Sequence, residues 1–587
     1  MASNKIGNNY HQHNRRYNCD NQQVTNHFNG LIVNSWLIIV LTGLIVYSQL
    51  AFVVYSCALR KFNRDSYVCV CDETYCDSLI EIESPPSAHV HMYETSRDGL
   101  RFHKSVISLI DSTTAADLAE LPNNLFGPTL TLTINLNPSQ RFQTINVGFG
   151  GTISDSTSLN ILSLSNRMGE SVIRDCFGPD GLEYRVARIP IGTSEASTRD
   201  YSLAEVPSGS LDDFTLADED IWYKIPVIRK AITLQPDIKL IATPWTAPIW
   251  LSNLKKGRPY KAPIKGEPTG HYYKLWALYM VKFLQAYQKH GINFWALTSG
   301  NKPYSSFLAN GPMGVPMLPY QQKSFIDNVL GPTLNQSGFF TRSYPIGPLK
   351  LLVLDDYLSF SNYYWIPLTL DDPVSKNFIS GIAFHWYKND YNTKHLLNLI
   401  HSKYQNYYLL STEAAEGTRP NEEKVSLGNW KRAENYGHDI IKVFNHWTNG
   451  WIDSNLALDM IGGPSKSRKF QDSPIIINSI HNEYYKQPSY YMLAHFTKFL
   501  GPGSVRIGHS IDSHLNDNIH LLTMINQDGY LIVIILNAND YPVEIRINGF
   551  AGGIVWQTIS SKTIQTYIGQ QQFNQPNYTD YYEQPIN

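Results

Sequence analysis

Short apolar runs alternate with longer amphipathic segments from about residue 149 to residue 450, and this pattern constrains the fold more than any other feature of the chain. Residues 272–290, for example, carry apolar side chains at helical spacing. Alternation of strand and helix over about 300 residues favours an α/β (β/α)8 TIM barrel over a doubly wound sheet. The apolar runs that we expect to be strands include 240–242, 294–297, 351–354, 382–384 and 408–410.

A glycine-rich stretch, Gly148-Phe-Gly-Gly151, stands at the start of this region. It lacks the G-x-G-x-x-G spacing of a dinucleotide-binding loop, so we interpret it as a turn and predict no cofactor.

Residues on both sides of the predicted barrel have the alternating pattern of half-buried strands. Residues 129–135 alternate with period two, and strands are expected again at 531–536 and 544–547. We therefore expect the barrel at 146–455 with 489–503, and an all-β, sandwich-like module made of 96–145 with 504–568. The tail 569–587 is rich in Gln, Asn and Tyr and is predicted to be disordered.

The N-terminal residues predict entry into the secretory pathway. Residues 1–30 are polar and include Lys5, Arg15 and Arg16, and the segment 31–56 that follows has an uncharged apolar core. This pattern fits a signal peptide, and a signal anchor is the alternative because about 20 apolar residues can span a bilayer. The protein is accordingly predicted to be lysosomal or secreted, and membrane-anchored if the segment is not cleaved.

Cysteine usage supports export. Four cysteines, Cys57, Cys69, Cys71 and Cys76, lie close together after the apolar segment, without the paired C-x-x-C spacing or the nearby His residues of a zinc site. The cluster therefore favours disulfide bonds, and we predict no metal site. Asn335 and Asn577 begin N-x-S/T sequons and are predicted glycosylation sites.

Charge and composition limit the partners. The formal net charge of −2 gives no reason to expect nucleic acid, which requires a basic face. In a barrel, catalytic groups lie at the carboxyl ends of strands, so the polar residues that follow the apolar runs are the candidates. Together they suggest an aromatic-lined pocket for a neutral, hydroxylated ligand. They are Arg188, Trp245, Asn301, Lys302, Asp355, Asp356, His385, Tyr387 and Glu413.

Several motifs make the chain resemble the lysosomal glucosylceramidase family of retaining glycoside hydrolases. They are Cys69-Val-Cys-Asp-Glu-Thr-Tyr-Cys76, Val147-Gly-Phe-Gly-Gly151, Thr243-Pro-Trp-Thr-Ala-Pro248, His385-Trp-Tyr387, Asp472-Ser-Pro-Ile-Ile476 and Tyr485-Lys-Gln-Pro488, in collinear order. The resemblance implies a barrel with an adjoining β module. It also implies a small three-stranded antiparallel sheet at 57–95 with 456–488, with disulfides Cys57–Cys69 and Cys71–Cys76.

The same resemblance assigns the catalytic positions. The family's nucleophile falls on Glu413, while its Thr-x-x-Asn-Glu-Pro acid/base stretch appears here as Thr298-Ser-Gly-Asn-Lys-Pro303. Lys302 thus occupies the proton-donor position. With an ordinary pKa near 10.4, a lysine is a poor acid at lysosomal pH and is not expected to perform that step.

Other pocket positions are partly kept and partly changed. The resemblance carries substrate-binding roles onto Arg188, Trp245 and Asn301, and nucleophile support onto His385 and Tyr387. Glu195 stands where the family has an aspartate that holds sugar hydroxyls. Further departures fall on Ala196, Gly311, Met313, Ser454 and Lys469.

Three hypotheses follow. The first is a catalytically impaired member of the glucosylceramidase family that binds a glycosphingolipid or another β-glucoside. The second is an active β-glucosidase that uses a substitute acid such as Glu195 or acts only on activated glycosides. The third is a non-catalytic protein, either a structural or decoy protein without a ligand in the barrel or one that binds glycolipid or a partner. A lipid-activator protein and a membrane surface are further partners that the resemblance allows.

Overall fold

The structure is a computed structural model that describes residues 57–572, except 112, 115–129, 208, 254–260, 309–310, 360–362, 389–390 and 512–517. The described residues belong to one compact unit. The N-terminal segments 1–30 and 31–56 and the sequon at Asn577 lie outside them. Within the described part, no helix combines the length and the apolarity needed to cross a bilayer.

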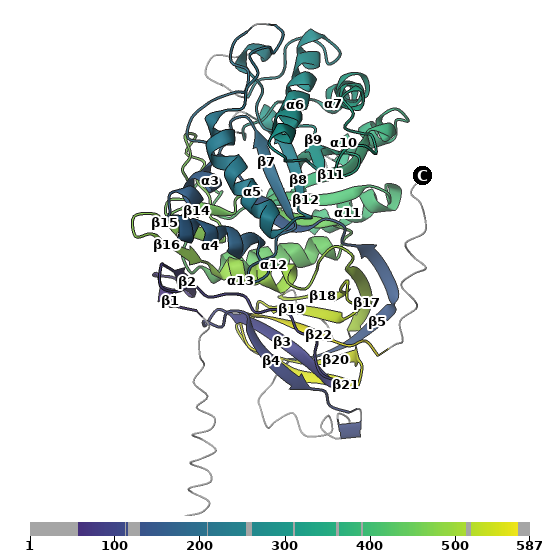
Figure 1. The fold of residues 1–587 in the computed structure, drawn as a ribbon. Coiled ribbons are helices and arrows are strands. Elements are labelled where there is room, and N and C mark those ends of the chain that lie inside the picture. Colours follow the sequence, from purple (N-terminus) through teal and green to yellow (C-terminus); the bar gives the residue numbers. More distant parts are fainter. Residues whose placement is uncertain are drawn as a thin grey trace, which may run out of the picture. The chain divides into compact units, whose positions relative to one another are not determined.

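Eight parallel strands close into the predicted TIM barrel (Figure 1). The strands follow one another around the barrel in sequence order, and the last pairs with the first. Their C-terminal ends therefore meet at one mouth. The strands are β6 (Gly148–Thr152), β7 (Val186–Ile191), β8 (Lys239–Pro244), β9 (Ala296–Thr298), β10 (Lys350–Tyr357), β11 (Ile379–His385), β12 (Tyr408–Ala414) and β13 (Gly450–Asp453).

Helices connect these strands and cover the outside of the barrel (Figure 1). Ser154 and Asn429 begin two of them, each with a side-chain oxygen that accepts a hydrogen bond from a backbone N–H of the first turn. The helix expected at 272–290 is α6 (His271–Lys289). The others are α3 (Asp155–Leu162), α4 (Asn166–Phe177), η2 (Glu219–Lys224), α5 (Ile225–Leu234), α7 (Pro319–Phe325), η5 (Ile326–Leu330), α8 (Gly331–Gln336), α10 (Trp365–Leu370), α11 (Tyr391–Lys403), α12 (Trp430–Phe444) and α13 (Pro488–Thr497).

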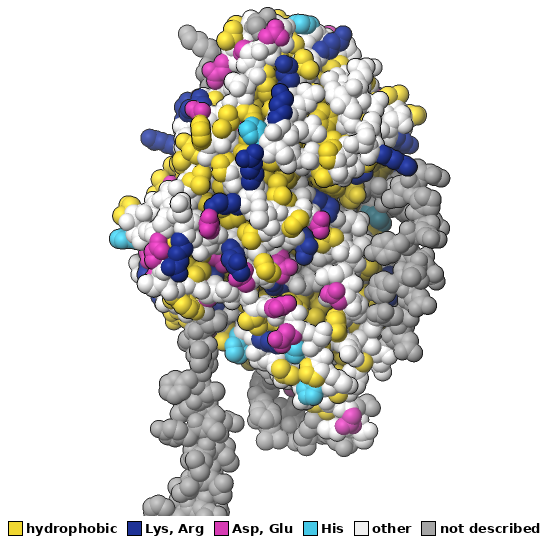
Figure 2. Space-filling model, viewed as in Figure 1, with side chains coloured by type: hydrophobic (Ala, Val, Ile, Leu, Met, Phe, Trp, Pro, Cys, Tyr) yellow, Lys and Arg dark blue, Asp and Glu magenta, His cyan; other side chains and the backbone are white. Residues whose placement is uncertain are grey.

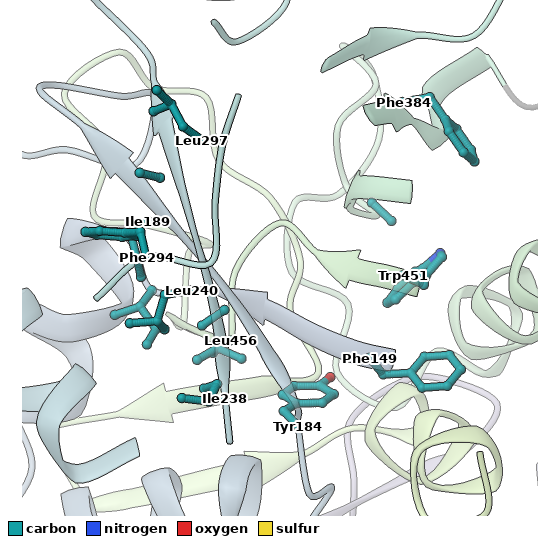
Figure 3. Close-up of a cluster of buried hydrophobic side chains, with 14 of the residues drawn as sticks. Phe149, Tyr184, Ile189, Ile238, Leu240, Phe294, Leu297, Phe384, Trp451 and Leu456 are labelled. Atoms are coloured by element: carbon teal, nitrogen blue, oxygen red, sulfur yellow. The ribbon is translucent and has the colours of Figure 1, made fainter. Parts of the chain in front are cut away.

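Side chains alternate between two cores along the barrel strands. In β13, Trp451 packs outward against the helices and Ile452 packs inside the barrel, and Leu240 and Ile241 divide in the same way in β8. Figure 3 shows part of the outer cluster, including Leu240, Phe384 and Trp451. The short apolar runs of the sequence are strands buried on both faces, which explains their lack of a polar side.

The glycine-rich stretch interpreted as a turn is instead the barrel strand β6. A Cβ atom on Gly150 would lie 1.8 Å from the carbonyl oxygen of Val186, and one on Gly151 would lie 2.4 Å from a methyl of Leu456. Glycine is therefore required at both positions, because other segments of the same chain approach the β6 backbone closely. A glycine repeat alone does not distinguish this case from a turn.

The β module is a nine-stranded sheet in the order β21-β20-β5-β17-β18-β19-β22-β3-β4. Its edges meet through a bridge between Ile110 and Ile554, so the sheet curls around an apolar core of its own. Its strands are β3 (His89–Ser96), β4 (His103–Ser108), β5 (Leu130–Thr144), β17 (Val505–Ile511), β18 (Ile519–Ile525), β19 (Leu531–Asn537), β20 (Val543–Phe550), β21 (Gly553–Ile559) and β22 (Thr563–Gly569).

Two expected boundaries of this module are wrong. β3 was assigned to the small sheet through residue 95, but it pairs with β22, and Val90 and Met92 pack into the core of the module. The disordered tail was expected from residue 569, but Gly569 pairs with Leu531 and Gln571 bridges Phe550. Residues 573–587 of that tail lie outside the described residues.

The small sheet holds both disulfides implied by the family resemblance, Cys57–Cys69 and Cys71–Cys76. It has five strands rather than three, and β14 and β15 are parallel rather than antiparallel. Residues 460–474, which join these two strands, are long enough for the crossover that a parallel pair needs. The strands are β1 (Leu59–Lys61), β2 (Tyr67–Cys71), β14 (Ala457–Asp459), β15 (Ile475–Asn478) and β16 (Glu483–Lys486).

Candidate active site

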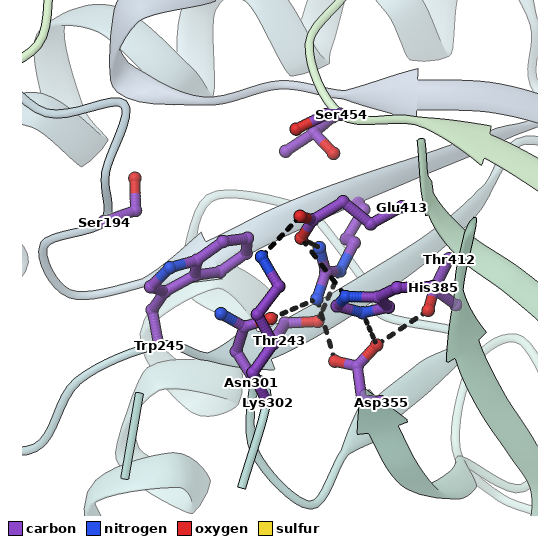
Figure 4. A network of polar contacts seen from close by, with 12 residues as sticks. Ser194, Thr243, Trp245, Asn301, Lys302, Asp355, His385, Thr412, Glu413 and Ser454 are labelled. Carbon is purple, nitrogen blue, oxygen red and sulfur yellow. Dashed lines mark hydrogen bonds and ion pairs between the residues drawn. The ribbon is translucent and has the colours of Figure 1, made fainter. Parts of the chain in front are cut away.

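The barrel brings the predicted site residues to one mouth (Figure 4). Arg188 lies in β7, Glu413 in β12 and His385 at the end of β11, whereas Trp245 and Lys302 follow β8 and β9. Their side chains border or lie beneath a cleft of about 730 Å³. The C-terminal ends of parallel strands converge in a barrel, which explains why residues 225 positions apart, such as Arg188 and Glu413, make contact.

Glu413 is buried and has both carboxylate oxygens occupied. Oε1 accepts hydrogen bonds from Lys302 Nζ at 2.5 Å and from the Tyr387 hydroxyl at 2.9 Å. Oε2 accepts one from the guanidinium of Arg188 at 2.8 Å, and His385 Nδ1 lies 3.8 Å away. The carboxylate is thus held between two cations.

Arg188 is the centre of the polar network below the cleft. Its guanidinium donates to Glu413, to Asp355 at 2.8 Å, to the Asn301 amide oxygen at 3.1 Å and to Thr243 at 3.1 Å. Its side chain is completely buried, so these partners replace the water that it loses. The planar guanidinium fixes the relative positions of two carboxylates.

Asp355 supports the opposite side of this network. It accepts hydrogen bonds from Arg188, from Thr412 at 2.7 Å and from His385 Nε2 at 3.0 Å. Because an ionised carboxylate only accepts, the Nε2 nitrogen of His385 carries the hydrogen. Asp355 and Thr412 therefore hold the imidazole and strand β12 in place.

Lys302 reaches Glu413 from an unusual backbone conformation. Its φ is 49°, in the left-handed region, and its backbone N–H donates to the carbonyl of Asp355 at 2.8 Å. The side chain then extends beside Trp245 toward Glu413, as Figure 4 shows, with Nζ 5.9 Å from the Trp245 ring centre and 5.3 Å from that of Tyr387. Aromatic faces and one carboxylate thus surround the ammonium.

Burial and charge act in opposite directions on the Lys302–Glu413 pair. Burial alone would raise the pKa of Glu413, but the Lys302 ammonium and the Arg188 guanidinium outweigh it and hold that pKa below its ordinary value. Burial alone would lower the pKa of Lys302, but attraction to Glu413 and Glu195 raises it above the ordinary value. Both groups are therefore charged over the physiological pH range.

Glu195 lies at the side of the cleft and acts as a hydrogen-bond acceptor. One carboxylate oxygen accepts from the indole nitrogen of Trp245, and the other accepts from the backbone N–H of Met313 at 2.7 Å. Of the remaining positions that depart from the family, Ala196, Gly311, Ser454 and Lys469 line the cleft. The predicted sequon at Asn335 lies far from these groups in sequence, and its side chain is exposed at the end of α8.

Several residues of the site were not assigned a role by the sequence. Asp355 was only one of many polar residues at strand ends, and Thr243, Thr412 and Tyr357 received no role. Their positions are the signal by which sequence analysis can find them, because all four lie near the C-terminal ends of barrel strands, where side chains reach the mouth. Of the basic side chains in the loops around the cleft, only Lys469 was singled out from the sequence, and Lys388, Arg419, Lys424 and Arg468 were not.

No described group of residues is suited to a metal ion. The only His, Cys, Asp or Glu side chains close enough together in the described part are Cys71, Cys76 and Asp77, and both sulfurs are committed to a disulfide. The cleft itself therefore offers carboxylate, ammonium, guanidinium and aromatic groups, the set expected for covalent sugar chemistry or for sugar binding.

Comparison with known proteins identifies relatives along the whole described chain. Residues 146–500 match the glycosyl hydrolase family 30 TIM-barrel domain, and residues 503–567 match the β-sandwich domain of the same family. The chain is 35% identical over 521 residues to the lysosomal acid glucosylceramidase of Mus musculus. This match covers 88% of this chain and 96% of the mouse protein.

Solved structures show the same fold at lower identity. SrfJ from Salmonella typhimurium is 20% identical with a TM-score of 0.69, and the match covers 82% of this chain and 100% of SrfJ. An endo-β1,6-glucanase is 24% identical with a TM-score of 0.67 over 82% of this chain and 99% of its own. These likenesses concern the arrangement of the barrel and the β module.

Proposed function

The chain belongs to glycosyl hydrolase family 30. From this membership and the geometry of the cleft, we propose that the protein is a retaining β-glucosidase scaffold for glucosylceramide-type glycolipids. We propose further that its catalysis is impaired at the proton donor. The observation that carries the proposal is the buried contact between Lys302 Nζ and Glu413 Oε1.

Glu413 has the surroundings of a working nucleophile. Retaining hydrolysis begins when a carboxylate attacks the anomeric carbon and the glycosidic oxygen leaves. Arg188 and Lys302 keep Glu413 ionised, and Tyr387 orients one of its oxygens. Its low pKa makes it a weak base but keeps the attacking form fully populated.

Lys302 cannot replace the missing acid. The leaving oxygen needs a proton unless it departs as a stable anion, and general acid catalysis of this kind contributes about 10²–10⁴-fold. The pKa of Lys302 is raised by Glu413 and Glu195, so its ammonium gives up a proton reluctantly. Its ammonium also occupies Oε1 of Glu413. A sugar must therefore displace the ammonium before that oxygen can attack.

The hypothesis that Glu195 acts as a substitute acid has less support. Both oxygens of Glu195 already accept hydrogen bonds, from Trp245 and from the backbone of Met313. Glu195 is better suited to holding sugar hydroxyls or fixing the loop at Met313.

Likeness to the mouse lysosomal enzyme supports a β-glucoside glycolipid as the ligand and the secretory pathway or the lysosome as the location. A cleaved signal peptide at 31–56 and N-glycosylation at Asn335 and Asn577 remain parts of this proposal, as do a lipid-activator protein and a membrane surface as partners.

A mechanism-based label tests the nucleophile separately from the acid. We would incubate the full chain at pH 5 with 2,4-dinitrophenyl 2-deoxy-2-fluoro-β-glucoside, whose phenolate leaves without a proton, and locate the adduct by mass spectrometry. The expected result is one fluoroglucosyl group esterified to Glu413. Glu413→Gln is the control and should remain unlabelled.

The same preparation is then assayed with glucosylceramide in detergent micelles, for which the leaving group requires an acid. We expect turnover far below that of the mouse enzyme assayed in parallel. Comparable turnover by the unmodified protein would overturn the impairment, and absence of label at Glu413 would instead favour a non-catalytic binding protein.

A further inference from the structure

The charge of the cleft differs from that of the chain as a whole. The full chain has a formal net charge of −2, and acidic and basic side chains both occur across the face shown in Figure 2. The acidic side chains that line the cleft are Glu195 and Glu413. The cationic ones are Lys302, Lys388, Arg419, Lys424, Arg468 and Lys469.

The inner and outer cations of the cleft have different partners. Lys302 is neutralised by Glu413 at the bottom of the cleft. The outer five, which we call the rim cations, are Lys388, Arg419, Lys424, Arg468 and Lys469. None of them forms an ion pair with a carboxylate of the described residues. Lys424 Nζ donates to the carbonyl oxygens of Gly417 at 3.0 Å and Arg419 at 2.6 Å, which leaves its charge uncompensated.

The acidic groups near the rim are already committed. Asp472 pairs with Arg432, and Glu423 pairs with Arg64 and accepts from Ser426. Glu422 accepts the backbone N–H of Arg419 rather than binding its guanidinium. The rim therefore presents positive charge that the fold itself does not neutralise.

Two of the loops that carry the rim cations follow successive barrel strands, and the third belongs to the small sheet that follows β13 in the chain. Lys388 follows β11, Arg419 and Lys424 follow β12, and Arg468 and Lys469 lie in the crossover between β14 and β15. Convergence of these strands at the barrel mouth brings the loops together, and this places the charges around one cleft.

The crossover loop is braced against the opposite wall. Ser465 Oγ donates to the carbonyl of Glu195 at 2.7 Å, and the backbone N–H of Lys466 donates to the carbonyl of Ser197 at 2.8 Å. Lys466 also pairs with Asp200. The backbone at Arg468 and Lys469 is consequently fixed over the cleft, so the two charges remain at its entrance.

We propose that the ligand of this cleft is an anionic β-glucoside, with a carboxylate, sulfate or phosphate on the part that extends from the glucose toward the rim. The inference rests on the proposed function, because it assumes that the sugar binds at Glu413. Converging cations raise the local concentration of anions and orient them, and guanidinium groups bind oxyanions in a bidentate manner. A neutral glycoside could accept hydrogen bonds from these side chains but would form no ion pair with them.

Matched disaccharides test the charge preference. Cellobionate and cellobiose share the β-glucosyl group, and only cellobionate carries a carboxylate on the second unit. We would measure both affinities for the full chain by calorimetry in 20 mM and 500 mM NaCl. Cellobionate should bind about tenfold more tightly at low salt, and the preference should shrink at high salt because mobile ions screen exposed charges.

Variants assign the effect to the rim. Replacing both Arg468→Ser and Lys469→Ser should abolish the preference without weakening cellobiose binding. Lys274→Ser, which removes an exposed, unpaired lysine of α6, should leave the preference unchanged. Equal affinities for the two sugars at low salt, or no binding of cellobionate, would overturn the proposal.

Two further outcomes identify what else would be wrong. If the double variant loses binding to phosphatidylserine vesicles but keeps its cellobionate affinity, the rim serves a lipid surface and the anionic glycoside is rejected. If the cellobionate preference is absent while Lys302→Glu gains hydrolysis, the anionic ligand is rejected and the proposed function stands.

Discussion

The ammonium nitrogen of Lys302 lies 2.5 Å from Oε1 of Glu413, whereas the two carboxyl groups of a retaining hydrolase lie about 5 Å apart. Both side chains are almost completely buried. The contact keeps Glu413 charged and positioned, and under the proposed function it fills the space in which a glycosidic oxygen would be protonated.

Lys302→Glu should create hydrolytic activity. Glutamate is shorter than lysine, so its carboxyl would withdraw from Glu413 and leave room for the glycosidic oxygen. A second carboxyl beside Glu413 would also have its pKa raised by the like charge, as a general acid requires. We expect kcat/KM for a β-glucoside with a poor leaving group to rise by about 10²–10⁴-fold.

Lys302→Gln is the matched control, because it removes the cation without supplying an acid. It should accelerate only the hydrolysis of dinitrophenyl β-glucoside, and the rate of hydrolysis of alkyl glucosides should be unchanged. Equal gains from Lys302→Gln and Lys302→Glu would show that freeing Glu413, rather than supplying a proton, limits the reaction.

Arg188→Met should destabilise the protein strongly. The substitution leaves the buried carboxylates of Asp355 and Glu413 without their shared cation. Breaking a buried pair in this way costs about 3–5 kcal/mol. The measurement is the midpoint of thermal unfolding, and adding Asp355→Asn should recover part of the loss. A double variant less stable than Arg188→Met alone would contradict the assigned network.

Stability should depend on pH through the Lys302–Glu413 pair. A carboxyl with a lowered folded pKa stabilises fully above its unfolded value, about 4.3, and this contribution is lost as the pH falls below that value. A lysine with a raised pKa stabilises fully below its unfolded value, about 10.4. The pair should therefore stabilise the fold evenly from about pH 5 to pH 9.

Unfolding midpoints of the wild type and Lys302→Gln, measured from pH 3 to pH 7, check this window. The advantage of the wild type should be largest above pH 5 and should shrink at lower pH, because Glu413 is then protonated in the unfolded chain but remains ionised in the folded protein. Parallel profiles for the two proteins would argue against an ion pair in the folded state.

Gly150→Ala should disrupt the barrel. The added methyl would lie 1.8 Å from the Val186 carbonyl within the β6–β7 pair, so the strands must separate. We expect a loss of about 3 kcal/mol or more. Gly291→Ala is the control, because its φ of +79° is strained but nothing lies within 4 Å, and it should cost about 1–2 kcal/mol. Similar losses would show that strain rather than collision dominates.

The barrel and strand β12, which carries Glu413, could be predicted because local pattern encodes them. The apolar runs at 240–242 and 408–410 are strands β8 and β12, and the helical spacing at 272–290 is α6. Periodicity did not predict the strand at Gly148–Gly151, where Gly150 packs closely against Val186 and no turn is formed. That requirement comes from a strand 36 residues away and leaves no local trace.

The sequence by itself determined the barrel, and it predicted Glu413 as the nucleophile with Lys302 at the position of the family's acid. Only the tertiary structure decided that Lys302 pairs with Glu413, that Arg188 joins two carboxylates, and that the crossover at 460–474 brings Arg468 and Lys469 over the cleft. The physical reason is that side-chain periodicity is local, whereas charge pairing depends on which loops the closed barrel brings together.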